Sequence, residues 1–234
     1  MPAATAPSVS PSDTSVPPRS WWWGFALYAA ISTFHVTTIA VNATAVITPT
    51  KLLLMAALVI AVVWACRGIR WRTPHVLLAS AIALSWLGDG AGALFPFLPE
   101  LPMMLLFFGL AHLVYIVLFQ RHLAVRRTPA WALVYAAWWV ALVVVLWPYL
   151  GALTVPVMVY GLVLGGTAAS STRCPALVVW GGALFLASDT VLAFRIFVPD
   201  AMPAWTSPLV MITYCAGQGL IAVGAVRMLQ RRRR

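Results

Sequence analysis

Long apolar stretches, almost free of charge, follow one another along nearly all of the chain after residue 20. Hydrophobic residues make up 62% of the 234 residues, and charged residues only 9%. A water-facing surface needs far more charge, so the chain is expected to have the lipid bilayer as its solvent. Lipid offers backbone groups no hydrogen-bonding partner, so segments that cross it are helical. The predicted fold class is therefore all-α, a polytopic integral membrane protein.

Turn residues and charges divide the apolar part into about eight segments. Each is close to the roughly 20 residues that cross about 30 Å of hydrocarbon as a helix. Prolines fall at or near several segment starts, where a missing N–H is tolerated, and Pro49 is one of them. The expected transmembrane spans are residues 21–42, 49–66, 74–96, 101–120, 130–147, 150–169, 175–198 and 205–228.

The chain ends differ from this apolar part in composition. Residues 1–18 are rich in Pro, Ser, Thr and Ala without periodicity, which is typical of a disordered tail. Residues 19–230 are expected to form one eight-helix domain, and residues 231–234 a basic tail. The three cysteines show no metal-ligand spacing and are interpreted as packing residues or reduced thiols.

The basic residues indicate the orientation in the membrane. The net charge of +10 comes from short runs between apolar segments, which argues against nucleic-acid binding. By the positive-inside rule both termini are expected in the cytoplasm of a bacterial cell, with a multi-pass chain in the plasma membrane. Two basic residues, Lys51 and Arg195, are expected on the opposite side, where they could hold an anionic group. The other thirteen, on the cytoplasmic side, are Arg19, Arg67, Arg70, Arg72, Arg121, Arg126, Arg127, Arg173, Arg227 and Arg231 to Arg234.

Only five acidic residues exist, and two of them, Asp89 and Asp189, lie inside expected spans. A carboxyl group inside a membrane helix costs several kcal/mol unless it faces a cavity or a partner, so both are candidates for function. Counted along their spans, both lie roughly 21 to 22 Å from the cytoplasmic face. The two carboxyl groups are therefore predicted to share one level in the outer half of the membrane.

Other polar residues cluster in the expected spans at helical spacing. They are predicted to lie mostly in the middle or outer half of the membrane, where they could orient a substrate, a water molecule or the two carboxyls. These candidates are His35 and Asn42 in the first span, His112 and Tyr115 in the fourth, and Tyr214 and Gln218 in the eighth.

Four motifs resemble one known family. They are S-W-L-G-D at residues 85–89, G-L-A-H-L-V-Y at 109–115, A-S-D-T-V-L-A at 187–193 and Y-C-A-G-Q-G-L-I at 214–221. In order and spacing they resemble the YhhN family, whose characterised members are lysoplasmalogenases. Family members often carry Lys-Pro at the start of the second span, whereas here Lys51 is followed by Leu52 and the proline is Pro49.

The resemblance implies a membrane hydrolase that cleaves the vinyl ether of a lysophospholipid, giving a fatty aldehyde and a glycerophospho head group. It implies no cofactor, no metal and no obligate protein partner beyond the bilayer. Such a cleavage needs an acid to protonate the vinyl ether and a base to activate water, which two carboxyls can supply. As a first assignment, Asp89 is the acid and Asp189 positions the water, while Lys51 and Arg195 hold the phosphate.

Three alternatives stay open at this point. A metal-dependent membrane hydrolase would want about three histidine ligands, and only His35 and His112 lie inside expected spans. A small proton- or cation-coupled transporter could use the same aspartate pair. A lipid-binding scaffold would bind lipid and leave it unchanged.

Overall fold

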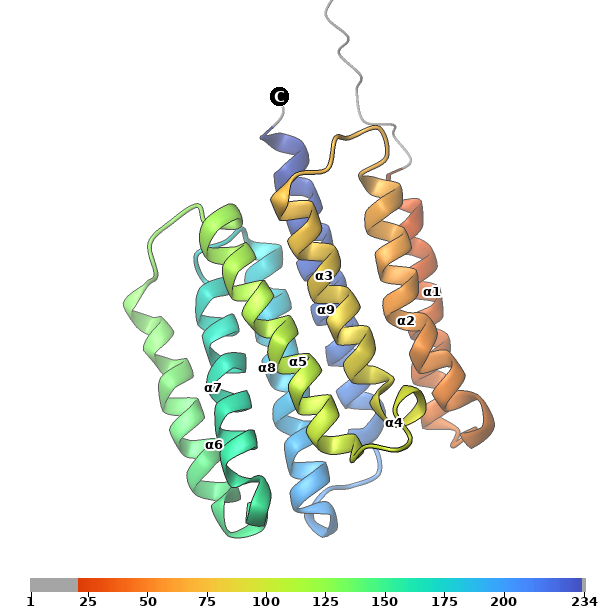
Figure 1. Cartoon of the computed structure of the whole chain (residues 1–234), viewed down its shortest axis with the longest axis vertical. Helices are drawn as coiled ribbons and strands as arrows, with labels where there is room; N and C mark the ends of the chain where they lie inside the picture. Colours follow the sequence, from red (N-terminus) through yellow and green to blue (C-terminus); the bar gives the residue numbers. More distant parts are fainter. Residues whose placement is uncertain (1–20, 233–234) are drawn as a thin grey trace, which may run out of the picture.

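The computed structural model describes residues 21–232, and this part of the chain is helical without any strand. The long helices run side by side, up and down, as one bundle (Figure 1). Short helical pieces complete several turns: α4 (Ala91–Leu94), η1 (Phe119–Leu123), η2 (Ala130–Leu133), η3 (Gly151–Leu153) and η4 (Pro199–Ala201). The long helices are α1 (Trp23–Ala40), α2 (Thr44–Ala65), α3 (Thr73–Asp89), α5 (Glu100–Leu118), α6 (Val134–Leu150), α7 (Thr154–Ser171), α8 (Ala176–Phe197) and α9 (Thr206–Arg231).

The expected spans match these helices in number and order within the described residues, with two differences of detail. Helix α2 begins at Thr44, so Pro49 lies inside it and removes one intrahelical hydrogen bond. Helix α3 ends at Asp89, where a continuous span to residue 96 was predicted, because the chain turns at Gly90 into the short α4. The predicted tail at residues 1–18 lies outside the described residues.

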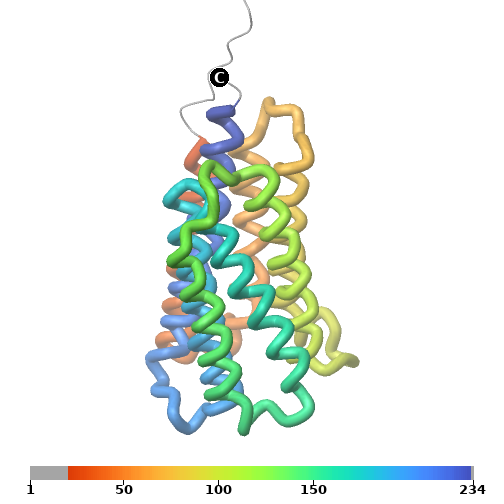
Figure 2. Tube along the Cα trace, turned by 90° about the vertical axis from the view of Figure 1, so that its left-hand side faces the viewer, coloured from red at the N-terminus to blue at the C-terminus, as the bar shows by residue number. Residues whose placement is uncertain are grey.

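The turns alternate between the two ends of the bundle. The end that carries the C-terminus also carries the α2–α3, α5–α6 and α7–α8 turns (Figures 1 and 2). The arginine-rich turns of the sequence are therefore gathered at this end, as the positive-inside reasoning requires. Glu100, the first residue of α5, and Asp200, in η4, lie at the opposite end. That the arginine-rich end is cytoplasmic stays a prediction.

Five segments of the described chain are long and apolar enough to cross a membrane. One of them, residues 130–171, contains both α6 and α7. Many large apolar side chains point outward, among them Phe34, Ile60 and Trp180, each more than half exposed. A surface of this kind suits lipid rather than water. The chain is thus a multi-pass membrane protein; α1 and α3 are shorter or less apolar, so a count of eight spans stays a prediction.

Two apolar clusters fill the bundle. The larger one joins α1, α2, α3, α5, η1, α7, α8 and α9. The smaller one has Leu146, Leu150 and Val157 at its centre, between α5, α6, α7 and α8 near the ends of these helices. Helices α8 and α9 approach closely because Gly181 and Gly217 face each other, and a Cβ on Gly217 would lie 3.0 Å from the Gly181 carbonyl oxygen. This close approach fixes the part of α9 that carries Tyr214 and Gln218.

The three cysteines are buried, and none forms a disulfide within residues 21–232. Cys66 and Cys215 pack in the larger apolar cluster, as does Cys174 in the turn between α7 and α8. Their packing agrees with the interpretation made from the sequence.

Candidate functional site

An apolar cavity of about 130 Å³ lies inside the bundle, lined from α2, α3, α5, α7, α8 and α9. A water molecule occupies about 30 Å³ of liquid, so the cavity has room for a few waters or for a short part of a larger molecule. Apart from backbone, its polar lining consists of Lys51, Asp89, Tyr160, Ser188, Asp189 and Tyr214. Both membrane carboxyls predicted from the sequence therefore face the same space.

Asp89 lies at the C-terminal end of α3, and its side chain is only 4% exposed. A helix C-terminus disfavours a negative charge, so a buried carboxylate there needs partners. Tyr214 of α9 donates a hydrogen bond to Oδ2 of Asp89 at 2.7 Å, and Nζ of Lys51 lies 3.6 Å from Oδ1. The ammonium and the phenol together satisfy the carboxylate.

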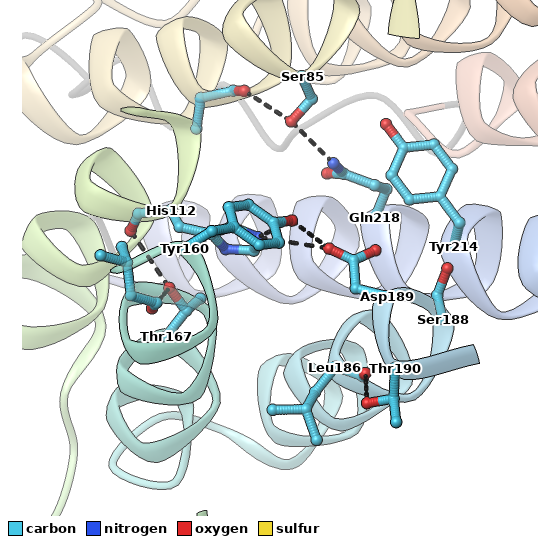
Figure 3. Close-up of polar contacts among 12 residues, drawn as sticks. Ser85, His112, Tyr160, Thr167, Leu186, Ser188, Asp189, Thr190, Tyr214 and Gln218 are labelled. Carbon is cyan, nitrogen blue, oxygen red and sulfur yellow. Dashed lines mark hydrogen bonds and ion pairs between the residues drawn. The ribbon is translucent and has the colours of Figure 1, made fainter. Parts of the chain in front are cut away.

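Asp189 lies in the middle of α8, and its partners are of another kind. Tyr160 of α7 donates a hydrogen bond to its Oδ2, and Figure 3 shows the hydroxyl and the carboxyl pointing toward each other. Nε2 of His112 lies 4.0 Å from the same oxygen and 3.4 Å from the Tyr160 hydroxyl. Within residues 21–232, no lysine or arginine forms an ion pair with Asp189. This carboxyl thus has a phenol and an imidazole beside it where Asp89 has an ammonium.

Aromatic rings pack around the side chains that hold the two carboxyls. The centroid of the Phe185 ring lies 4.6 Å from that of His112 and 5.4 Å from that of Tyr214. The ring centroids of Phe108 and Tyr214 are 6.0 Å apart. Phe185 is 1% exposed. Phe108 lines the cavity and Phe185 packs against it, so the surroundings of the two carboxyls are largely apolar, which strengthens each electrostatic contact there.

A second layer of hydrogen bonds holds the helices that carry the site. Tyr115 of α5 donates to Oε1 of Gln218 at 2.6 Å, and Nε2 of Gln218 donates to Ser85 at 3.0 Å. Gln218 lies one turn from Tyr214, and Ser85 lies one turn from Asp89. The Gln218 amide therefore links α3, α5 and α9 by hydrogen bonds, one helical turn from the Asp89 and Tyr214 pair.

The structure brings together most of the residues selected from the sequence. Asp89, Asp189, Lys51 and Tyr214 line the cavity, and His112, Tyr115 and Gln218 support it. Three candidates do not join them. Among these, His35 pairs with Thr50 between α1 and α2 at 2.8 Å.

The other two, Asn42 and Arg195, lie outside the cavity lining for local reasons. Helix α1 ends at Ala40, so Asn42 is an exposed turn residue with φ of 55°, a conformation that Asn tolerates better than most residues. Arg195 donates to the Thr206 hydroxyl at 2.6 Å and fixes the α8–α9 turn. A joint phosphate site of Lys51 and Arg195 stays a prediction.

Two residues of the cavity were not selected from the sequence, Tyr160 and Ser188. Tyr160 is the single tyrosine of the expected span 150–169, and a single phenol there gives no pattern at helical spacing. Ser188 directly precedes Asp189 and donates to the Val210 carbonyl oxygen at 3.0 Å, which links α8 to α9. Their importance comes from the packing of α7, α8 and α9.

No group of three or more His, Cys, Asp or Glu side chains that could hold a metal occurs in residues 21–232. His35 and His112 lie on different helices and have different partners, Thr50 for the first and Tyr160 for the second. The metal-dependent alternative therefore has no ligand set in this part of the chain.

The sequence profile of the YhhN family matches residues 46–225. The chain belongs to the YhhN family. The match runs from α2 into α9 and includes every polar residue that lines the cavity, so the resemblance seen in the four motifs is confirmed. YhhN membership is consistent with a membrane hydrolase. No curated protein and no solved structure compared with the chain gives a significant match.

Proposed function

We propose that this YhhN protein is a lysoplasmalogenase, which hydrolyses the vinyl ether of a lysophospholipid to a fatty aldehyde and a glycerophospho head group. One observation carries the proposal: two buried carboxyl groups from different helices face one apolar cavity, and their partners give them opposite character. Pairs of this kind, with one carboxyl neutral and one ionised, are suited to reactions that pass through an oxocarbenium ion.

The partners favour a division of roles opposite to the first assignment from the sequence. Lys51 stabilises Asp89 as a carboxylate, because an ammonium nearby favours the charged form. Asp189 has no such cation, so a neutral carboxyl costs less there than a buried charge. Asp189 is thus the proton donor, and Asp89 is the carboxylate that stabilises positive charge and accepts a proton from water.

The reaction then balances on these two groups. Asp189 protonates the β-carbon of the vinyl ether, which leaves an oxocarbenium ion opposite the Asp89 carboxylate. Water adds to the α-carbon and gives a proton to Asp89, and the product of this step is a hemiacetal. As the hemiacetal collapses, Asp89 returns that proton to the glycerol oxygen, and the hemiacetal hydroxyl gives its proton to Asp189. One water is consumed, and both carboxyls regain their starting state.

The neighbouring side chains support this cycle. The phenol of Tyr160 is hydrogen-bonded to Asp189 and can stabilise the anion that remains after proton transfer. Tyr214 is hydrogen-bonded to Asp89 and stabilises its anion before it accepts the proton from water. The apolar lining of the cavity, which includes Phe108, also limits the access of bulk water to the reactive ion.

The test is an assay of the purified protein in lipid nanodiscs with a lysoplasmalogen, measuring fatty aldehyde release. We expect turnover by the native chain and a loss of at least about 100-fold in kcat for Asp89→Asn and for Asp189→Asn. Asp200→Asn is the matched control, because Asp200 is exposed in the α8–α9 turn. Near-native turnover by either cavity variant would remove the catalytic role of that aspartate.

The same preparation tests the transporter alternative, which uses the same aspartate pair. Reconstituted into liposomes, a proton-coupled carrier would take up H⁺ when substrate is added and would leave the lipid unaltered. Aldehyde release without coupled H⁺ uptake supports the hydrolase. The reverse result would replace it with the carrier.

A further inference from the structure

One part of the cavity has no role in the proton transfers. Leu105, Val157, Ala193 and Phe197 line the cavity and also belong to the smaller apolar cluster, which lies apart from the main core. We call these four residues the apolar arm. They come from α5, α7 and α8.

The apolar arm begins at Asp189. Ala193 and Phe197 follow Asp189 at intervals of four residues, so they continue its face of α8 toward the end of the bundle. On α7, Val157 precedes Tyr160 by three residues and lies on the same face. Tyr160 and Asp189 therefore lie at the inner end of the apolar arm.

The charged part of the cavity comes from other helices. Lys51 lies on α2, Asp89 on α3 and Tyr214 on α9, and the ammonium of Lys51 is the cationic group in the cavity lining. Its side chain is 30% exposed, so an anion can reach it. The cavity therefore has an order from the cationic side, through Asp89, to Asp189 and then to the apolar arm.

This order matches the order of groups in one kind of lipid. In a lysoplasmalogen the phosphate is followed by glycerol, the ether oxygen and α-carbon, the β-carbon and then the hydrocarbon chain. The proton goes to the β-carbon, which carries the chain, and water adds to the α-carbon. Such a molecule requires a proton donor next to the apolar arm, which is Asp189, and a base next to the cation, which is Asp89 beside Lys51.

We propose that the apolar arm binds the hydrocarbon chain next to the reacting bond, and that Val157 and Ala193 limit which chains the site accepts, with the head group on the Lys51 side. This inference rests on the proposed function for the identity of the substrate. The cavity is too small for a whole lysolipid. Leu105 and Phe197 are only half-buried, so the rest of the chain can pass between them toward the surrounding lipid.

The experiment places larger side chains in the apolar arm and measures both the binding of a lipid probe and the turnover of the substrate. Val157→Trp narrows it, and Val159→Trp is the matched control, since Val159 is two residues away on α7 and is 56% exposed. Ala193→Leu is a milder second variant, with Ala187→Leu as its control on the exposed face of α8. The probes are two saturated-ether glycerophospholipids, which carry no vinyl ether to hydrolyse: the longer has a chain of about 16 carbons, and the shorter has a methyl group in its place, too short to enter the apolar arm.

We expect Val157→Trp and Ala193→Leu to weaken binding of the longer probe by roughly tenfold, the effect of displacing about two methylene groups, and to raise KM for a long-chain lysoplasmalogen similarly. The shorter probe and both control variants should change less than about twofold. Equal binding of the longer probe by Val157→Trp, Ala193→Leu and their controls would overturn the inference. Chain-dependent binding by a native protein that releases no aldehyde would instead retain the apolar arm and reject the hydrolase.

Discussion

The ammonium of Lys51 lies 3.6 Å from a carboxylate oxygen of Asp89, across the interface between α2 and the end of α3. Asp89 is almost fully buried at a helix C-terminus, where its charge would otherwise be opposed by both desolvation and the helix dipole. Lys51 gives that charge a partner. It also makes Asp89 differ from Asp189, and this difference is the basis of the proposed division between acid and base.

Replacing Lys51 by Met should therefore reduce activity by about 100-fold or more, because Asp89 would lose the cation that keeps it ionised. Lys51→Arg should restore a substantial part of the activity, since it keeps the charge. The measurement is kcat for aldehyde release by protein of verified fold. Equal activity of Lys51→Met and Lys51→Arg would contradict the role of the charge.

Tyr160→Phe removes the hydroxyl that bonds Asp189 and leaves the ring in place. We expect kcat to fall by about 10- to 100-fold with little change in KM, because the bond matters most when Asp189 has lost its proton. Tyr149→Phe is the control, as Tyr149 is 54% exposed on α6. If the loss appears in KM alone, Tyr160 acts in substrate binding instead.

Hydrolysis in D₂O should place one deuterium on carbon 2 of the released aldehyde. Because Asp189 is fixed on one helix beside the cavity, the deuteron should arrive on one face of the double bond. The aldehyde is reduced at once to the alcohol to prevent exchange, and the configuration is then measured. A racemic product would argue against delivery by a positioned side chain.

Gln218→Leu should destabilise the protein by about 1–3 kcal/mol, because the Tyr115 hydroxyl would be buried without its acceptor. Ser85 would lose a donor at the same time. Thermal unfolding in detergent, followed by intrinsic fluorescence, reports the change. Gln218→Leu combined with Tyr115→Phe should recover part of the loss, and a double variant no more stable than the single one would contradict this account.

Cys174 should resist alkylation in the folded protein. Burial raises the pKa of the Cys174 thiol to about 12, although Arg173 and Arg126 act in the opposite direction. A raised pKa keeps the unreactive thiol form below that pH, so the reactive thiolate appears only as the pH rises toward 12. A variant with Cys174 as its single cysteine should react slowly with maleimide at pH 8 and rapidly after denaturation. Fast reaction of the folded form would show that the α7–α8 turn is open.

Much of the fold followed from the pattern of apolar and charged residues. The described helices fall close to the predicted spans, because a helix in lipid has a length set by the bilayer and a composition set by hydrocarbon. The end of α3 at Asp89 was not predicted. A turn inside an apolar run depends on packing, and here Gly90 lies against Leu52 and Leu94, where a Cβ would collide with both.

The sequence by itself determined that Asp89 and Asp189 are candidates for function, because a carboxyl group in a membrane helix costs free energy unless the fold gives it a partner or a cavity. Only the tertiary structure decided which partners each one has. Asp89 pairs with Lys51, 38 positions away, and Asp189 pairs with Tyr160, 29 positions away. In each pair the two residues come from different helices. The same packing left Asn42 in a turn and Arg195 bonded to Thr206. The free energy of inserting a carboxyl group into a membrane can be assessed from a single residue, whereas its protonation state depends on its neighbours in space.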